Sequence, residues 1–131
     1  MYRIFSLWLL LSGLSFSAQA QYSLIFCEDV TAEGKPTVIS NSFMVDDDGG
    51  VLKFLLKTDE KINTDNIDFR IFYVSDSGKE EEISRMPQKV DANWNFAWKE
   101  VVFFDPGNYK IKVYTGKGTY LTSANLNIKG K

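Results

Sequence analysis

Apolar and polar residues alternate along much of the chain after its first 20 residues. In residues 51–58, Leu52, Phe54 and Leu56 fall on one face of an extended strand, and lysines fall on the other. Such a period of two is typical of half-buried β-strands, and no segment of the sequence has a convincing helical period. The pattern therefore predicts an all-β protein. The same period recurs in residues 67–75 and 108–115.

Glycine, proline, asparagine and aspartate divide the alternating segments into short strands. We expect strands at residues 22–28, 37–45, 51–58, 67–75, 80–85, 94–104, 108–115 and 119–129. The remaining segments are expected to be loops at 29–36, 59–66 and 86–92, and turns at 46–50, 76–79 and 115–118. The second and third strands should form a hairpin across the turn between them.

The expected strands differ in how they should be buried. Residues 67–75 carry apolar side chains on both faces, which is typical of a central strand. Three consecutive glutamates mark residues 80–85 as a charged edge strand. Four apolar residues in a row at 101–104 break the alternation, so we expect a bulge there or a strand buried on both sides.

The segment Asp105-Pro106-Gly107-Asn108-Tyr109 leads into the strand at 108–115. An acidic residue, a glycine two residues later and a tyrosine opening a strand resemble the tyrosine corner of immunoglobulin-like sandwiches. The cysteine that commonly follows this tyrosine by two residues is Ile111 here, so the usual disulfide between the sheets cannot form. The resemblance implies a single immunoglobulin-like or fibronectin-III-like antiparallel β-sandwich, and the spacing of turns predicts seven or eight strands.

A sandwich core is built from alternate residues of two facing sheets. Each core side chain contributes roughly 1.5–3 kcal/mol when it is fully buried. The hydroxyl of the corner tyrosine is expected to donate a hydrogen bond to the backbone upstream. The residues predicted to face inward are Leu52, Phe54, Leu56, Phe69, Ile71, Tyr109, Ile111, Val113, Leu126 and Ile128.

Residues 1–20 have the pattern of a secretory signal peptide. Arg3 supplies a positive start, residues 4–16 are apolar, and Ala18-Gln19-Ala20 matches the cleavage signal of small residues. We therefore expect cleavage after Ala20 and export to the bacterial periplasm or out of the cell, with an uncleaved anchor as the alternative. The exported β-sandwich domain would span residues 21–131 and would not insert into the membrane.

Composition excludes several classes of function. The chain has no histidine, so catalytic triads that use histidine and histidine-ligated zinc sites are excluded. A net charge of −2 gives no basic surface for nucleic acid. The single cysteine, Cys27, is expected to be a buried small hydrophobe, with an intermolecular disulfide as the alternative. We expect a protein that is not an enzyme and has no cofactor, although two carboxylates alone could support a small hydrolase.

Asp46, Asp47 and Asp48 form the one candidate metal motif, in a turn that ends in two glycines. Carboxylate oxygens suit calcium, but the spacing and the distal glutamate of an EF-hand are absent. We therefore expect a solvated turn and no dependence of stability on calcium.

Aromatic and basic residues share the outward face of two expected strands. If residues 67–75 and 108–115 are neighbours with their isoleucines inward, Arg70, Phe72, Lys110, Lys112 and Tyr114 point outward. Aromatic residues and arginine are enriched at protein interfaces. These five residues form the candidate partner-binding site, which should be locally positive and favour an acidic or mixed partner.

Trp94, Phe96 and Trp98 alternate at the start of the strand at 94–104. Alternate aromatic residues are typical of core packing, but flat rings can also stack on sugars, and both interpretations stay open. The sequence as a whole favours an exported, non-catalytic β-sandwich that binds a protein. The alternative is a carbohydrate-binding or calcium-assisted adhesion module.

Overall fold

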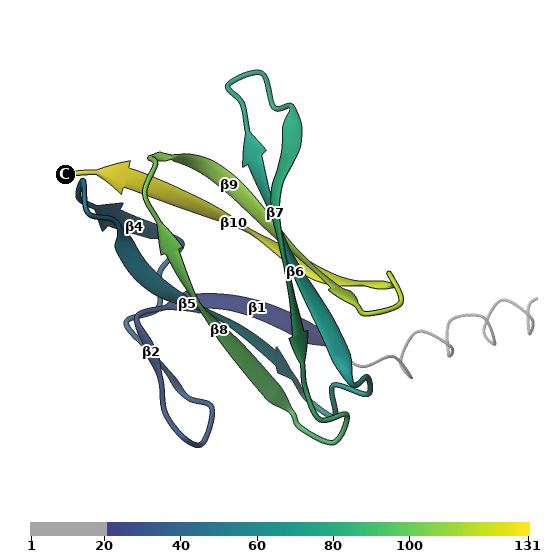
Figure 1. The fold of residues 1–131 in the computed structure, drawn as a ribbon. Coiled ribbons are helices and arrows are strands. Elements are labelled where there is room, and N and C mark those ends of the chain that lie inside the picture. Colours follow the sequence, from purple (N-terminus) through teal and green to yellow (C-terminus); the bar gives the residue numbers. More distant parts are fainter. Residues whose placement is uncertain (1–20) are drawn as a thin grey trace, which may run out of the picture.

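Two facing β-sheets enclose the core of the protein (Figure 1). The computed structural model describes residues 21–131, so the predicted signal peptide lies outside the described residues. The strands are β1 (Tyr22–Cys27), β2 (Asp29–Val30), β3 (Pro36–Thr37), β4 (Ser42–Val45), β5 (Gly50–Thr58), β6 (Asn66–Val74), β7 (Glu80–Lys89), β8 (Phe96–Phe103), β9 (Gly107–Thr115) and β10 (Tyr120–Gly130). The three-stranded sheet has the order β1-β5-β8, the five-stranded sheet has the order β4-β10-β9-β6-β7, and β2 and β3 form a separate hairpin. The all-β prediction is confirmed.

Alternate residues of the two sheets fill the space between them, and all ten residues predicted to face inward are buried. Aromatic rings meet at the centre of this core. The Phe54 ring lies edge-on to Phe26 with 5.3 Å between centroids, and it is tilted against Phe69 at 5.9 Å. Ile62 and Val90 are also buried in the core, although they belong to segments that were expected to be loops. These two loops are therefore anchored to the sandwich.

The tyrosine corner is present. The Tyr109 hydroxyl donates a hydrogen bond of 2.7 Å to the backbone carbonyl of Asp105, as the resemblance implied. Burial raises the pKa of this hydroxyl, and the nearby Asp105 carboxylate raises it further. Gly107 has a φ of 155°, and a Cβ there would lie 2.8 Å from the Tyr73 ring. The close approach of that ring explains the glycine in the corner.

The expected hairpin between residues 37–45 and 51–58 is wrong. β4 pairs in parallel with β10 in the five-stranded sheet, whereas β5 lies between β1 and β8 in the other sheet. The chain crosses between the sheets at residues 46–50, where Gly49 takes a φ of 94° and a Cβ on Gly50 would collide with the Val45 side chain. A local turn signal does not distinguish a hairpin from such a crossover, and burial of Val45 in the core selects the crossover.

The expected strand at 37–45 is also interrupted, because Val38 takes a φ of 52° and separates β3 from β4. The loop predicted at 29–36 instead forms the β2–β3 hairpin, in which Asp29 pairs with Thr37 and Val30 with Pro36. The prediction failed because the glycine and proline of this segment end a long strand but permit two strands of two residues.

β7 continues to Lys89, so the loop predicted from residue 86 is wrong. Pro87 is tolerated inside this strand because β7 lies at the edge of its sheet. The bulge expected at 101–104 is wrong as well: β5 and β8 pair without a register shift, and Val102 is exposed on the outward face. Irregular pairing occurs instead in β7, where Ile71 pairs with Ser84 and Phe72 with Glu82, and in β10 between Tyr120 and Thr122.

The β2–β3 hairpin lies against the outer face of the three-stranded sheet. Asp29 forms an ion pair of 2.6 Å with Lys53 of β5, and a Cβ on Gly34 would lie 2.6 Å from the Phe96 ring of β8. Leu55 and Cys27 point outward from the sheet but are fully buried. Neither belongs to the main core cluster, and we call these two buried residues the outer layer. The burial predicted for Cys27 is confirmed, and it raises the pKa of the thiol.

Candidate functional site

The outer face of the five-stranded sheet carries the candidate partner-binding residues. β6 and β9 are antiparallel neighbours, as expected, and their register places Phe72 opposite Lys110 and Arg70 opposite Lys112. With Ile71 and Ile111 buried in the core, the five predicted residues share the outward side. We call them the cation–aromatic face: Arg70, Phe72, Lys110, Lys112 and Tyr114.

Each ring of this face lies under a cation. The Arg70 guanidinium carbon is 3.9 Å from the centroid of the Tyr114 ring, and the Lys112 ammonium is 4.4 Å from the centroid of Phe72. Both rings are half-buried. The Tyr114 ring also meets Tyr120 of β10 edge-on, with 5.7 Å between centroids. The sequence predicted which side chains share this face, but it did not predict their stacking.

Acidic residues offset much of the positive charge expected on this face. Glu80 of β7 lies 2.9 Å from the Lys112 ammonium and 3.7 Å from that of Lys110. The hydrogen bond from Lys112 holds the pKa of Glu80 below its ordinary value. Arg70 pairs with Asp68 on its own strand at 3.1 Å. The face is therefore mixed in charge, because β7 brings its glutamates alongside the basic residues of β9.

Asp68 is a candidate residue that the sequence analysis missed. One of its carboxylate oxygens pairs with Arg70, while the other, Oδ1, is buried and has no hydrogen-bond partner among residues 21–131. A buried acceptor without a donor costs roughly 1–3 kcal/mol. Asp68 lies opposite Tyr114 in the sheet. It lines a hollow of about 570 Å³ whose wall also includes Arg85 and Lys117. In the sequence, the only feature that could have identified Asp68 is its outward position between two apolar residues of the strand.

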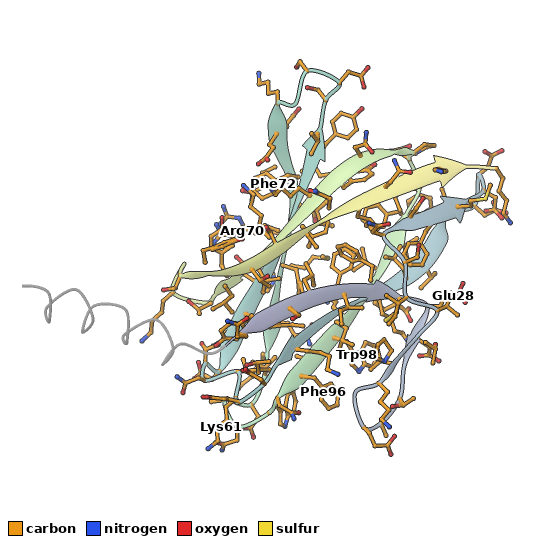
Figure 2. All side chains as sticks on the ribbon, turned by 180° about the vertical axis from the view of Figure 1, so that it is seen from behind. Glu28, Lys61, Arg70, Phe72, Phe96 and Trp98 are labelled. Atoms are coloured by element: carbon orange, nitrogen blue, oxygen red, sulfur yellow. The ribbon has the colours of Figure 1, made fainter. Side chains whose placement is uncertain are left out.

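The aromatic stripe lies on the opposite side of the sandwich. Figure 2 shows Phe96 and Trp98 on the three-stranded sheet, away from Arg70 and Phe72 on the five-stranded sheet. The core interpretation is wrong for the two tryptophans: Trp94 is 49% exposed and Trp98 is 39% exposed. Phe96 is half-buried beneath the β2–β3 hairpin. The residue of this segment that points into the core is Ala97.

The aspartate turn forms a local hydrogen bond. The Asp46 carboxylate accepts a bond of 3.0 Å from the backbone N–H of Asp48. Within residues 21–131 no three side chains of histidine, cysteine, aspartate or glutamate are grouped as metal ligands. The same residues include no helix that is long and apolar enough to cross a membrane.

Comparison with known proteins identifies the fold alone. No family model matches the chain, and no curated protein matches it. The structure is similar to the crystal structure of an immunoglobulin-like protein from Pseudomonas aeruginosa, with a TM-score of 0.53 and 10% sequence identity over 86% of this chain and 98% of that one. The immunoglobulin-like architecture inferred from the tyrosine corner is therefore confirmed.

Proposed function

We propose that this protein is an exported, non-catalytic module that binds another protein through its cation–aromatic face. One observation carries the proposal: the outer face of the five-stranded sheet holds two half-buried rings, each positioned under a cation. Among residues 21–131, the β2–β3 hairpin covers only the other sheet. The face is thus open to a partner.

The ordering of these side chains favours binding. Long basic side chains lose rotamer freedom when a partner immobilises them, which costs roughly 0.5–1.5 kcal/mol each. Here Arg70 and Lys112 are already positioned by a ring and by a carboxylate. These two side chains have therefore already lost much of their rotamer freedom in the free protein, so binding a partner would cost less conformational entropy.

The chemistry of the face indicates the kind of partner. Rings flanked by both cations and carboxylates suit a protein surface of mixed charge with an apolar centre. Because the ion pairs are partly exposed, association should weaken as salt rises.

Export is supported by the N-terminal pattern of Arg3, the apolar residues 4–16 and the small residues before Gln21. Intact-mass analysis of protein recovered from the cell envelope of a Gram-negative expression host tests it. A chain that begins at Gln21 is expected, and a chain that retains residues 1–20 would contradict export with cleavage.

The double variant Phe72→Ser with Tyr114→Ser tests the binding face. It should lose about 1 kcal/mol of stability per lost cation–π contact and should fail to capture the partners that the parent protein captures from its native envelope. The matched control is Val102→Ser, which changes an exposed apolar residue on β8 of the other sheet. This control should capture the same partners as the parent.

Two outcomes would overturn the proposal. If the double variant is folded and captures every partner of the parent, the face is not the binding site. If the double variant unfolds, Lys110→Gln decides, because it removes a half-buried cation but leaves both rings. Unchanged capture by Lys110→Gln across a range of salt concentrations would then contradict the role assigned to the charges of the face.

A further inference from the structure

A hollow of about 380 Å³ lies at the end of the three-stranded sheet, where the chain crosses from β7 to β8. We call it the tryptophan hollow. Two exposed tryptophans contribute to its wall, and no residue that lines it is ionisable. Its lining consists of Gln88, Trp94, Asn95, Phe96, Ala97 and Trp98.

The backbone that presents the two indoles is held firmly. The N–H of Trp94 donates to the Asp91 carbonyl at 3.0 Å, and the Trp94 carbonyl accepts from the N–H of Ile62 at 2.7 Å. The next carbonyl, that of Asn95, accepts from the N–H of Thr58 at 3.0 Å. Ile62 and Thr58 are buried, so the crossing segment is fixed to the body of the domain.

Trp98 is held by two contacts, one to its backbone carbonyl and one to its ring. Its backbone carbonyl, at the free edge of β8, accepts a hydrogen bond of 3.0 Å from the Gln88 side-chain amide of β7. The Lys53 ammonium lies 4.7 Å from the centroid of its ring. The backbone that presents both tryptophans is therefore fixed before any ligand arrives, which lowers the entropic cost of binding.

We infer that the tryptophan hollow binds an uncharged carbohydrate chain. Flat indole rings can stack on the apolar faces of sugar rings, and a concave apolar surface with a few polar groups is the usual form of a ligand site. The lining residues are not ionisable, and the Lys53 ammonium beside Trp98 is already paired with Asp29 at 2.6 Å, which favours a neutral sugar over an acidic one. The site is independent of the cation–aromatic face, which lies on the other sheet.

The polar groups of the hollow distinguish a sugar from a proline-rich peptide, the other ligand that exposed tryptophans commonly bind. The Gln88 amide nitrogen is engaged by the Trp98 carbonyl, while its amide oxygen takes part in no hydrogen bond among the described residues. That oxygen lies at the accessible surface, where a ligand's hydroxyl can donate to it. Sugar hydroxyls donate as well as accept, whereas proline lacks an N–H and offers only carbonyl acceptors.

Intrinsic fluorescence tests the inference directly. The chain has three tryptophans, and Trp8 lies in the predicted signal peptide. In the full chain carrying Trp8→Phe, all tryptophan emission therefore comes from the hollow. Titration with soluble neutral polysaccharides, namely a β-glucan, a mannan and a xylan, should give a saturable change in emission for at least one of them. Polygalacturonate and a polyproline peptide are the comparison ligands.

Variants assign the binding to the hollow. In affinity electrophoresis with the polysaccharide that binds, Trp98→Ala and Trp94→Ala should each weaken retardation at least roughly tenfold. Phe104→Ala is the matched control, because Phe104 is an exposed aromatic residue outside the hollow. This control should bind as the parent does.

Three results would overturn the inference: no response to any neutral polysaccharide, a response only to polygalacturonate or to polyproline, or binding that both tryptophan variants retain. Should Trp98→Ala fail to fold, Trp94→Ala decides alone, since Trp94 lies outside the strands and is 49% exposed.

Discussion

Leu55→Ala should destabilise the protein as much as a substitution in the main core. Leu55 has no exposed surface, although its chain neighbours Phe54 and Leu56 point into the core on the other side of the sheet. We attribute its burial to the β2–β3 hairpin, which lies over the outer face and contacts Lys53 and Phe96 there. Truncation of a fully buried leucine leaves a cavity and costs about 2–5 kcal/mol. Truncation of an exposed leucine on the same strand would cost little stability.

Urea denaturation measures this loss. A domain of this size has a urea dependence of about 1–3 kcal/mol per molar, so a loss near 3 kcal/mol moves the midpoint by about 1–3 M. Leu56→Ala is the control for the main core and should show a similar shift. Val51→Ala is the control for the outward face of β5, where Val51 is 54% exposed, and should change stability by about 0.5 kcal/mol or less.

If Leu55→Ala behaves like Val51→Ala, the hairpin does not cover this face in solution and the outer layer does not exist. Gly34→Ala provides an independent check from the hairpin side. Gly34 is buried with a φ of 85°, and a Cβ there would lie 2.6 Å from Phe96. This substitution should lower the midpoint through the clash with Phe96 together with strain at the positive φ, and a neutral result would show that the hairpin is not packed on the sheet.

Three further predictions concern the corner, the charged face and the aspartate turn. Tyr109→Phe should keep the fold and lose about 1 kcal/mol, because the hydrogen bond to Asp105 is removed, and a neutral result in urea would show that this bond does not contribute. Glu80 has a lowered pKa, so its stabilising contribution is complete above the ordinary glutamate pKa of about 4.3 and is lost as pH falls through the lower folded value. The stability difference between the parent and Glu80→Gln should therefore vanish in acid, and a difference that is constant from pH 7 to pH 3 would contradict the ion pairs with Lys112 and Lys110. The melting temperature should be equal in calcium and in chelator, whereas a rise of several degrees with calcium would identify the Asp46 turn as a binding site.

The inward faces of the central strands could be predicted from the sequence because each position follows from a period of two. Leu52, Ile71 and Ile111 are buried as expected, and the same period correctly put the five residues of the cation–aromatic face together. Periodicity within a strand does not show what lies over the outside of a sheet. Leu55 falls in the polar phase of its strand but is fully buried, and the segment that folds back over this face of the sheet was expected to be a loop.

Connections between strands were less predictable than the strands themselves. Gly49 and Gly50 signal a turn, but the choice between a hairpin and a crossover depends on which sheet completes its core with Val45. The location of the candidate sites on the sheets was also hard to predict from the sequence. Trp94 and Trp98 were expected to share a face, and they line one hollow, but local spacing did not show which side of the sheet that face would be.

The parallel pairing of β4 with β10 affects how the domain would respond to tension. Backbone hydrogen bonds join the Asn127 N–H to the Asn41 carbonyl at 2.8 Å and the Lys131 N–H to the Val45 carbonyl at 3.0 Å. The start of β1 and the end of β10 lie at opposite sides of the sandwich (Figure 1). A force that pulls these two ends apart would drag β10 forward and β4 backward along a shared axis. The bonds between them cross that axis, so they would be loaded together in shear, and the speed of mechanical unfolding would depend on their collective rupture.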